Sequence, residues 1–236
     1  MNGPPETSDP EACARYLREL GTTHAGVLPI AEAALALASF DRPRVDFGRY
    51  RDHLQLLTRD VGRHSGAAGD LAARARALNE IILLKYGYSG DELSYDDLQN
   101  ANLMRVIVDP FHGGQICGAA ELRELLKGAA GRDSELSPEH YEAVSDRDVL
   151  LRLQNNLKAR LLQAQQHERA LMVVETMIML ASDLAELWRE AGMLHRHLGN
   201  IRAAGAALEQ YVVRAPDGAA RHQAAAILQQ LRAQLN

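Results

Sequence analysis

Six residues in the last third of the chain impose a tight geometry on that segment. Within residues 185–218, Gly192 and Ala204 stand where two helices would cross closely, because larger side chains would push the helices apart. Gly199 suits the turn between the helices, and a proline ends the second helix. The spacing predicts an antiparallel helical hairpin with a tryptophan in the wedge between its helices. The set comprises Trp188, Gly192, Gly199, Ala204, Leu208 and Pro216.

These offsets resemble those of a tetratricopeptide repeat, whose period is about 34 residues. One period earlier, apolar residues occupy equivalent positions in a weaker copy that lacks the tryptophan and glycine landmarks. The last predicted helix, at about residues 219–235, has one apolar side and one polar side, as expected of a capping helix. The weaker copy consists of Leu157, Leu161, Ala170, Val174 and Met177.

Helical patterns also account for most of the N-terminal half. Pro10 opens a helix that Gly21 is expected to end, and a second helix rich in Ala and Leu covers about residues 29–40. A third begins near Phe47, and a fourth runs from Asp70 to Gly87. Ser145 is predicted to cap the first helix of a run that continues to the C-terminus. The chain is therefore predicted to be mainly α.

The middle of the chain contains an abrupt junction. An amphipathic helical stretch, residues 97–106 (DLQNANLMRV), runs without a turn residue into the β-branched triplet of VIVDPFHGG at 106–114. A helix and a strand are normally separated by a connection of several residues. This junction is therefore the most unusual feature of the middle of the chain.

Several segments in order resemble the SirB-type transglutaminase-like proteins of bacteria. They are ALNEIILLKYGYSGD at 77–91, NANLMRVI at 100–107, VDPFHGG at 108–114, and the tetratricopeptide end. The resemblance implies a helical remnant of a papain-like α+β domain at 1–130, followed by tetratricopeptide-like hairpins at 145–236. Residues 127–145, rich in Gly, Ser and Pro, are the expected connection.

In that family, a triad-like site combines a Cys or Ser, a His and an Asp. The resemblance places Asp109 at the Asp position, while the nucleophile and His positions have no counterpart here. An orienting Asp acts only through a His that activates a nucleophile. Asp109 is therefore interpreted as a vestige or a turn residue of a degenerate site. We expect the chain to be a non-catalytic scaffold rather than an enzyme, and to act through protein contacts.

A rival hypothesis is a cysteine-dependent hydrolase or acyl transferase of transglutaminase-like type. It would use Cys117 as the nucleophile, His112 as the base and Asp109 as the orienting group. A glycine-rich loop is a poor frame for such a pair, and a loop histidine with a small buried cysteine is the favoured interpretation. The flanking glycines are Gly113, Gly114 and Gly118.

The concave face of the repeats is the remaining candidate site. Its arginines would suit an acidic or C-terminal carboxylate peptide from an unidentified protein partner. The alternative is that this face simply packs on the N-terminal domain. By repeat offset, the candidate residues are Arg152, Asn155, Arg189, Met193 and Arg196.

Composition narrows the class of partner. A net charge of −5 argues against nucleic-acid binding, and no apolar run is long enough to cross a bilayer. Two distant cysteines and an N-terminus without a signal-peptide pattern favour a cytoplasmic location. No cofactor or metal is expected. His195 and His197 stand two apart on a helix, where both are expected to face solvent rather than to share a metal.

Loss of central elements should expose apolar surface in the N-terminal half. At about 25 cal/mol per Å², several hundred Å² amounts to roughly 10 kcal/mol, comparable to the whole stability of a domain. We therefore expect this half to be rearranged, partly open or paired as a homodimer through that face.

Overall fold

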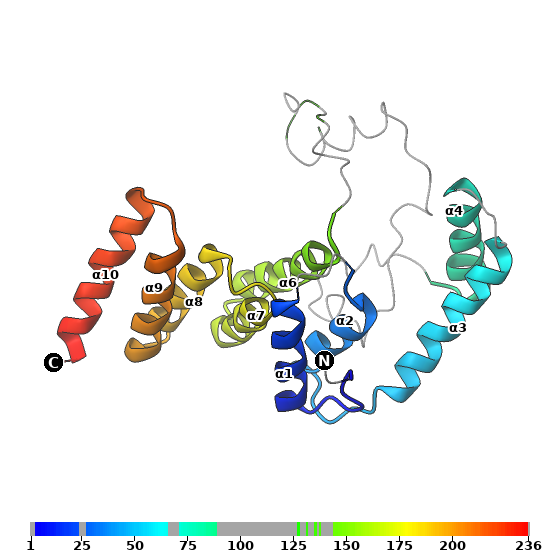
Figure 1. Ribbon diagram of the computed structural model, residues 1–236, viewed down its shortest axis with the longest axis horizontal. Helices are drawn as coiled ribbons and strands as arrows, with labels where there is room; N and C mark the ends of the chain where they lie inside the picture. The colour runs from blue at the N-terminus through cyan, green and yellow to red at the C-terminus, as the bar shows by residue number, and fades with distance from the viewer. Residues whose placement is uncertain are drawn as a thin grey trace. The chain divides into compact units, whose positions relative to one another are not determined.

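The computed structural model describes residues 3–23, 27–65, 71–88 and 144–235, together with the isolated positions Lys127, Gly131, Glu135 and Ser137. The mainly α prediction is confirmed, and the described residues form no strand beyond an isolated bridge between Thr7 and Asp46. The helices are α1 (Pro10–Thr22), α2 (Ile30–Ala38), α3 (Gly48–Ser65), α4 (Leu71–Asn79), the π-helix η1 (Glu80–Lys85), α6 (Asp146–Gln163), α7 (His167–Leu180), α8 (Ala185–His197), α9 (Ile201–Arg214) and α10 (Ala219–Leu235) (Figure 1).

The described helices fall into two compact units. The larger unit holds α1, α2 and α6–α10, and the smaller unit holds α3, α4 and η1. This division differs from the predicted one, which placed all of residues 1–130 in one domain. Residues up to Phe47 instead group with the C-terminal helices.

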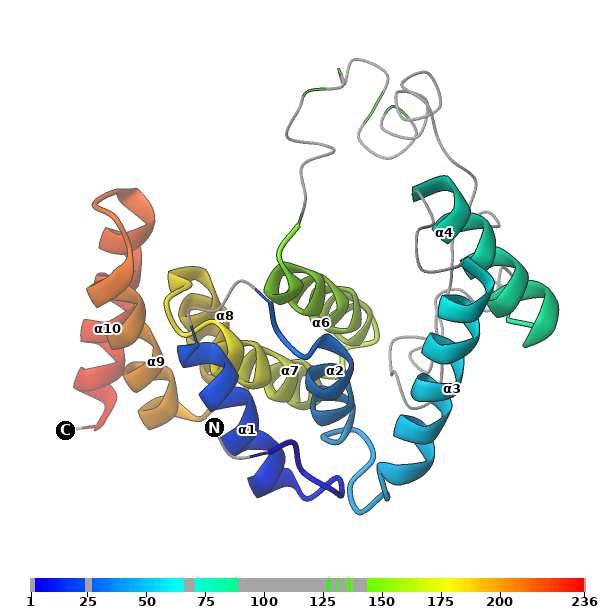
Figure 2. The same cartoon turned by 45° about the vertical axis from the view of Figure 1, so that its right-hand side comes forward.

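The C-terminal helices form the predicted array. Helices α6–α10 follow one another in chain order in both ribbon views (Figures 1 and 2). Ser145 caps α6 as predicted, because its hydroxyl accepts a 3.1 Å hydrogen bond from the Asp148 amide. Gly199 has a φ of +76°, which explains why a glycine joins α8 to α9.

Gly192 marks the close crossing of α8 and α9. A Cβ placed on Gly192 would lie 2.7 Å from Cγ of Leu208 and 3.4 Å from the Ala204 carbonyl oxygen. Trp188 packs against the cores on both sides of this crossing, and its indole donates a 2.8 Å hydrogen bond to the Ser182 carbonyl. The predicted hairpin is therefore confirmed at the residues that defined it.

The pair α1 and α2 packs on the α6/α7 hairpin. Arg147 of α6 donates to the carbonyls of Gly21 and Thr23 at 3.2 and 3.1 Å, and the Leu28 amide donates to Asp146 at 2.8 Å. The prediction that Gly21 ends α1 is wrong, because the helix continues to Thr22. Gly21 instead allows the backbones of α1 and α7 to touch.

The smaller unit is held by polar contacts around α3. Asp60 is 8% exposed and accepts hydrogen bonds of 2.7 Å from the Lys85 ammonium and the Tyr86 hydroxyl. His53 lies 2.5 Å from the Tyr88 hydroxyl through its Nε2. These contacts tie the end of η1 to α3. The predicted fourth helix is thus present, although its second half is a π-helix and its proposed cap, Asp70, lies outside the described residues.

Candidate functional site

The rival enzyme hypothesis rests on three residues outside the described part of the chain. Asp109, His112 and Cys117 all lie outside the described residues, as does the junction at 97–114. Both candidate sites that can be described belong to the larger unit. One is the predicted peptide-binding face, and the other is a pocket that the sequence did not predict.

All five residues of the predicted peptide-binding face are exposed. Arg152 and Asn155 lie on α6, and Arg189, Met193 and Arg196 lie on α8. Helices α1 and α2 leave these five side chains exposed, and α2 packs against a different side of α6, which carries Leu153, Gln154, Leu157 and Leu161.

An ion pair joins the two helices of this face. The Lys158 ammonium lies 2.5 Å from the Glu190 carboxylate, with side-chain exposures of 12% and 35%. Such a pair, half-removed from water, fixes the register of α6 against α8 more firmly than a fully exposed pair would.

Arg189 already has a carboxylate partner within the peptide-binding face. Its Nε donates a 2.6 Å hydrogen bond to Glu186, and this contact raises the pKa of Arg189. Within the described residues, Arg152 and Arg196 form no ion pair. These two arginines are therefore the cations of the face that remain available to an anionic ligand.

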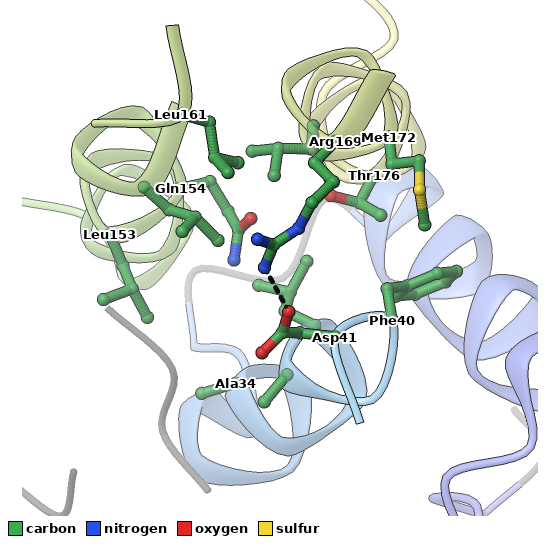
Figure 3. Close-up of a pocket in the computed structure, with 13 residues that line it drawn as sticks. Ala34, Phe40, Asp41, Leu153, Gln154, Leu161, Arg169, Met172 and Thr176 are labelled. Atoms are coloured by element: carbon green, nitrogen blue, oxygen red, sulfur yellow. Dashed lines mark hydrogen bonds and ion pairs between the residues drawn. The ribbon is translucent and has the colours of Figure 1, made fainter. Parts of the chain in front are cut away.

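A pocket lies on the opposite side of α6, between α2, α6 and α7 (Figure 3). Its empty space amounts to about 510 Å³, a figure that includes the part open to solvent. Most of its walls are aliphatic. The lining residues are Ala34, Leu37, Ala38, Phe40, Asp41, Leu153, Gln154, Leu157, Leu161, Arg169, Met172, Val173 and Thr176.

Three polar features interrupt these apolar walls. Arg169 reaches across from α7 to Asp41, with 2.6 Å between Nη2 and Oδ1 (Figure 3). The Thr176 hydroxyl donates a 2.7 Å hydrogen bond to the Val173 carbonyl of its own helix. Gln154 projects from α6 into the space between the helices (Figure 3).

Gln154 is the unusual member of the pocket. It is only 4% exposed, and its amide has no hydrogen-bond partner among the described residues. Its amide atoms are not sealed from solvent, since His195 Nδ1 is the one fully buried side-chain N or O atom without a partner among the described residues. Gln154 is not among the site residues predicted from the sequence. It could have been found as a glutamine on the same helical face as Leu150, Leu157 and Leu161.

The prediction that His195 faces solvent is wrong. Its side chain is 15% exposed, Nδ1 is buried without a hydrogen-bond partner, and Nε2 lies 3.5 Å from Glu175 of α7. The helical hairpin of α7 and α8 encloses the ring, which a single-helix argument could not anticipate. Among the described residues, no three His, Cys, Asp or Glu side chains gather as metal ligands would.

Comparisons with known proteins support the two parts of the chain separately. A family model for the tetratricopeptide repeat matches residues 157–232, and one for the transglutaminase-like superfamily matches residues 104–155. The first match spans both the predicted repeat and its weaker copy. The second is short and crosses the connection predicted at 127–145.

Relatives among curated proteins are distant. The UPF0162 protein of Xylella fastidiosa strain Temecula1 / ATCC 700964 is 21% identical over 242 residues, covering 82% of this chain and 86% of the relative. The UPF0162 protein of strain 9a5c matches with the same identity and coverage. No solved structure matches the chain.

Within the described residues, none of the helices combines the length and apolar character needed to cross a bilayer. The chain thus carries tetratricopeptide repeats and a segment similar to the transglutaminase-like superfamily.

Proposed function

We propose that this chain is a SirB-type transglutaminase-like protein that has lost its catalytic centre and acts as a scaffold through its helical repeats. The distant relatives carry more residues than this chain over the aligned region, as a shortened centre would require. Their alignment extends over 242 positions, but 82% of this 236-residue chain is about 194 residues. About 48 aligned positions therefore have no residue of this chain opposite them.

Triad chemistry gives such a loss a clear consequence. Asp109 is the one triad position for which the resemblance supplies a counterpart, and a carboxylate cannot activate a nucleophile without an intervening base. Any binding of a partner must then use surfaces that fold independently of the lost centre. The repeats meet this condition, because each helical hairpin packs mainly on its neighbours.

The observation that carries the proposal is the exposed row on α6 and α8. Arg152 and Arg196 are unpaired cations among the described residues, and Asn155 and Met193 add polar and apolar contact area. The Lys158–Glu190 pair holds their two helices together. We propose that this face binds an acidic peptide, with a terminal carboxylate received by an arginine.

The proposal is tested with fluorescent Asp- and Glu-rich peptides that carry a free or an amidated C-terminus. Arg152→Glu combined with Arg196→Glu should weaken binding at least about tenfold, and added salt should weaken binding by the wild type. Arg18→Glu combined with Arg202→Glu changes the net charge equally at exposed positions of α1 and α9, and should have little effect.

If both double variants weakened peptide binding equally, the effect would be explained by net charge, and the face would not be a specific binding site. Binding unchanged by Arg152→Glu with Arg196→Glu would remove it as well. A preference for the free carboxyl terminus over the amide would assign an arginine to that group.

We also propose that the N-terminal half forms a homodimer through the apolar surface left by the lost centre. Light scattering on the full chain across a range of concentrations tests this assembly. A monomer at every concentration would contradict it and would leave the peptide-binding proposal unaffected.

A further inference from the structure

We propose that the pocket between α2, α6 and α7 binds a small, uncharged, mainly apolar molecule that carries one hydroxyl, amide or carbonyl group. The site lies outside the proposed peptide-binding face. Gln154 and Asn155 are neighbours on α6, yet the first is buried in the pocket and the second is exposed. The two proposals can therefore fail separately.

The apolar character of the ligand follows from the walls. Nine of the thirteen lining residues have aliphatic, aromatic or thioether side chains, and they come from all three helices and the turn after α2. Water in such a space would find few hydrogen-bond partners, whereas an aromatic or branched aliphatic group would replace it favourably.

The absence of charge follows from the two ionisable lining residues. Asp41 and Arg169 bind each other, and Arg169 also donates a 2.6 Å hydrogen bond to Gln166. A charged ligand would have to break this pair or remain uncompensated between apolar walls. The pair bridges the turn after α2 to α7 and so closes one side of the pocket.

The hydrogen-bonding group follows from Gln154. Its amide offers two donors and an acceptor, and none of them is used by a described residue. A ligand hydroxyl could donate to its oxygen or accept from its nitrogen. Thr176 can only accept a further hydrogen bond, because its one proton is already donated to the Val173 carbonyl, whereas Gln154 can both donate and accept. Gln154 is therefore the residue that sets the specificity of the site.

The test titrates the full chain with 4-fluorophenol and with its apolar isostere 4-fluorotoluene, followed by fluorine NMR. The measured quantity is the ratio of the two dissociation constants, which cancels effects common to both probes. In Gln154→Leu, the preference for the phenol should fall by about threefold to tenfold relative to the wild type, as expected for the loss of one hydrogen bond.

Two further variants locate the binding. Gln163→Leu makes the same substitution at an exposed position of α6 and should leave the ratio unchanged. Leu153→Trp places an indole in the pocket from its half-buried edge and should abolish binding of both probes. Circular dichroism checks that each variant retains its helices.

No binding of either probe at millimolar concentration would overturn the proposal. It would be overturned equally if Gln154→Leu retained the wild-type ratio, or if folded Leu153→Trp still bound both probes. A fall in the ratio confined to Gln154→Leu supports it. If Leu153→Trp does not fold, the comparison of Gln154→Leu with Gln163→Leu decides the question.

Discussion

Gly21 lies directly against the carbonyl oxygen of Met179: a Cβ on this glycine would stand 2.2 Å from that oxygen. The Leu180 carbonyl carbon and oxygen follow at 3.2 Å. These neighbours are backbone atoms, which cannot rotate away as a side chain can. The contact sets the distance between α1 and the end of α7, and with it the position of α2 over the pocket.

Replacing Gly21 with alanine should therefore separate α1 from α7. We expect a destabilisation of about 2–3 kcal/mol, at the upper end for overpacking, even though alanine favours a helix. Urea denaturation followed by circular dichroism measures the change. Gly205→Ala in α9 is the matched control, because its Cβ would meet only Leu228 Cδ1, at 3.8 Å.

The control should be neutral or stabilising by up to about 1 kcal/mol, the difference in helix propensity. If Gly21→Ala were as stable as Gly205→Ala, the close approach of α1 to α7 would be wrong.

The repeat region could be predicted because its defining residues act locally. Gly199 needs a positive φ and Ser145 caps its own helix, so short-range rules identify both. Gly192 was found because its partner, Ala204, belongs to the same hairpin. Gly21 was misinterpreted for the opposite reason, since the backbone that it touches lies more than 150 positions later.

The candidate sites also differ in how far local sequence patterns could predict them. Repeat offsets identified exposed positions such as Arg152 and Arg196, but not the pairing of Arg189 with Glu186. The pocket was missed because α2 comes from a segment assigned to another domain. Without α2, Gln154 is simply a polar residue near the middle of a helix, and its burial is a tertiary property.

Asp60 should make the stability of the smaller unit depend on pH. The hydrogen bonds from Lys85 and then Tyr86 hold the pKa of Asp60 below its ordinary value of 3.8. A lowered carboxyl pKa stabilises the folded state above the ordinary value, and this contribution is lost as the pH falls through the folded pKa. We expect Asp60→Asn to destabilise α3 and η1 at neutral pH, with a difference that shrinks in acid.

At alkaline pH, Lys85 and Tyr86 make the stability of the smaller unit fall as the pH rises. Hydrogen bonding to Asp60 raises the pKa of Lys85 above 10.5 and that of Tyr86 above 10.0. Their contributions are complete below those ordinary values and are lost as the pH rises through the folded ones. Hydrogen exchange of α3 and η1, compared between the wild type and Asp60→Asn at each pH, measures both the acidic and the alkaline pH dependence. Asp52→Asn at an exposed position of α3 is the control, and an equal effect there would contradict the assignment.

The two cysteines should differ sharply in reactivity. Cys13 has no exposed surface, and burial raises the pKa of its thiol, so it should react with maleimide only as fast as α1 opens. Any rapid labelling of the native chain therefore reports Cys117, and Cys117→Ala should abolish it. Mass spectrometry of the labelled chain counts the reacted thiols.

This experiment also separates the scaffold from the rival enzyme. The scaffold proposal expects Cys117 to react no faster than an ordinary thiol such as glutathione. An activated nucleophile would react much faster near neutral pH, because its thiolate population is raised. That result, lost in His112→Ala, would overturn the non-catalytic proposal.

The Lys158–Glu190 pair should be energetically coupled, because Lys158 is largely removed from solvent. We expect a double-mutant cycle of Lys158→Met and Glu190→Gln to give a coupling energy of about 1–2 kcal/mol. The exposed pair of Arg232 and Glu209, also 2.5 Å apart, is the control and should give about 0.5 kcal/mol or less. Similar couplings in the two cycles would show that α6 and α8 are not held by this contact. A strong coupling would also predict that Lys158→Met weakens acidic-peptide binding by loosening the face that carries Arg152 and Arg196.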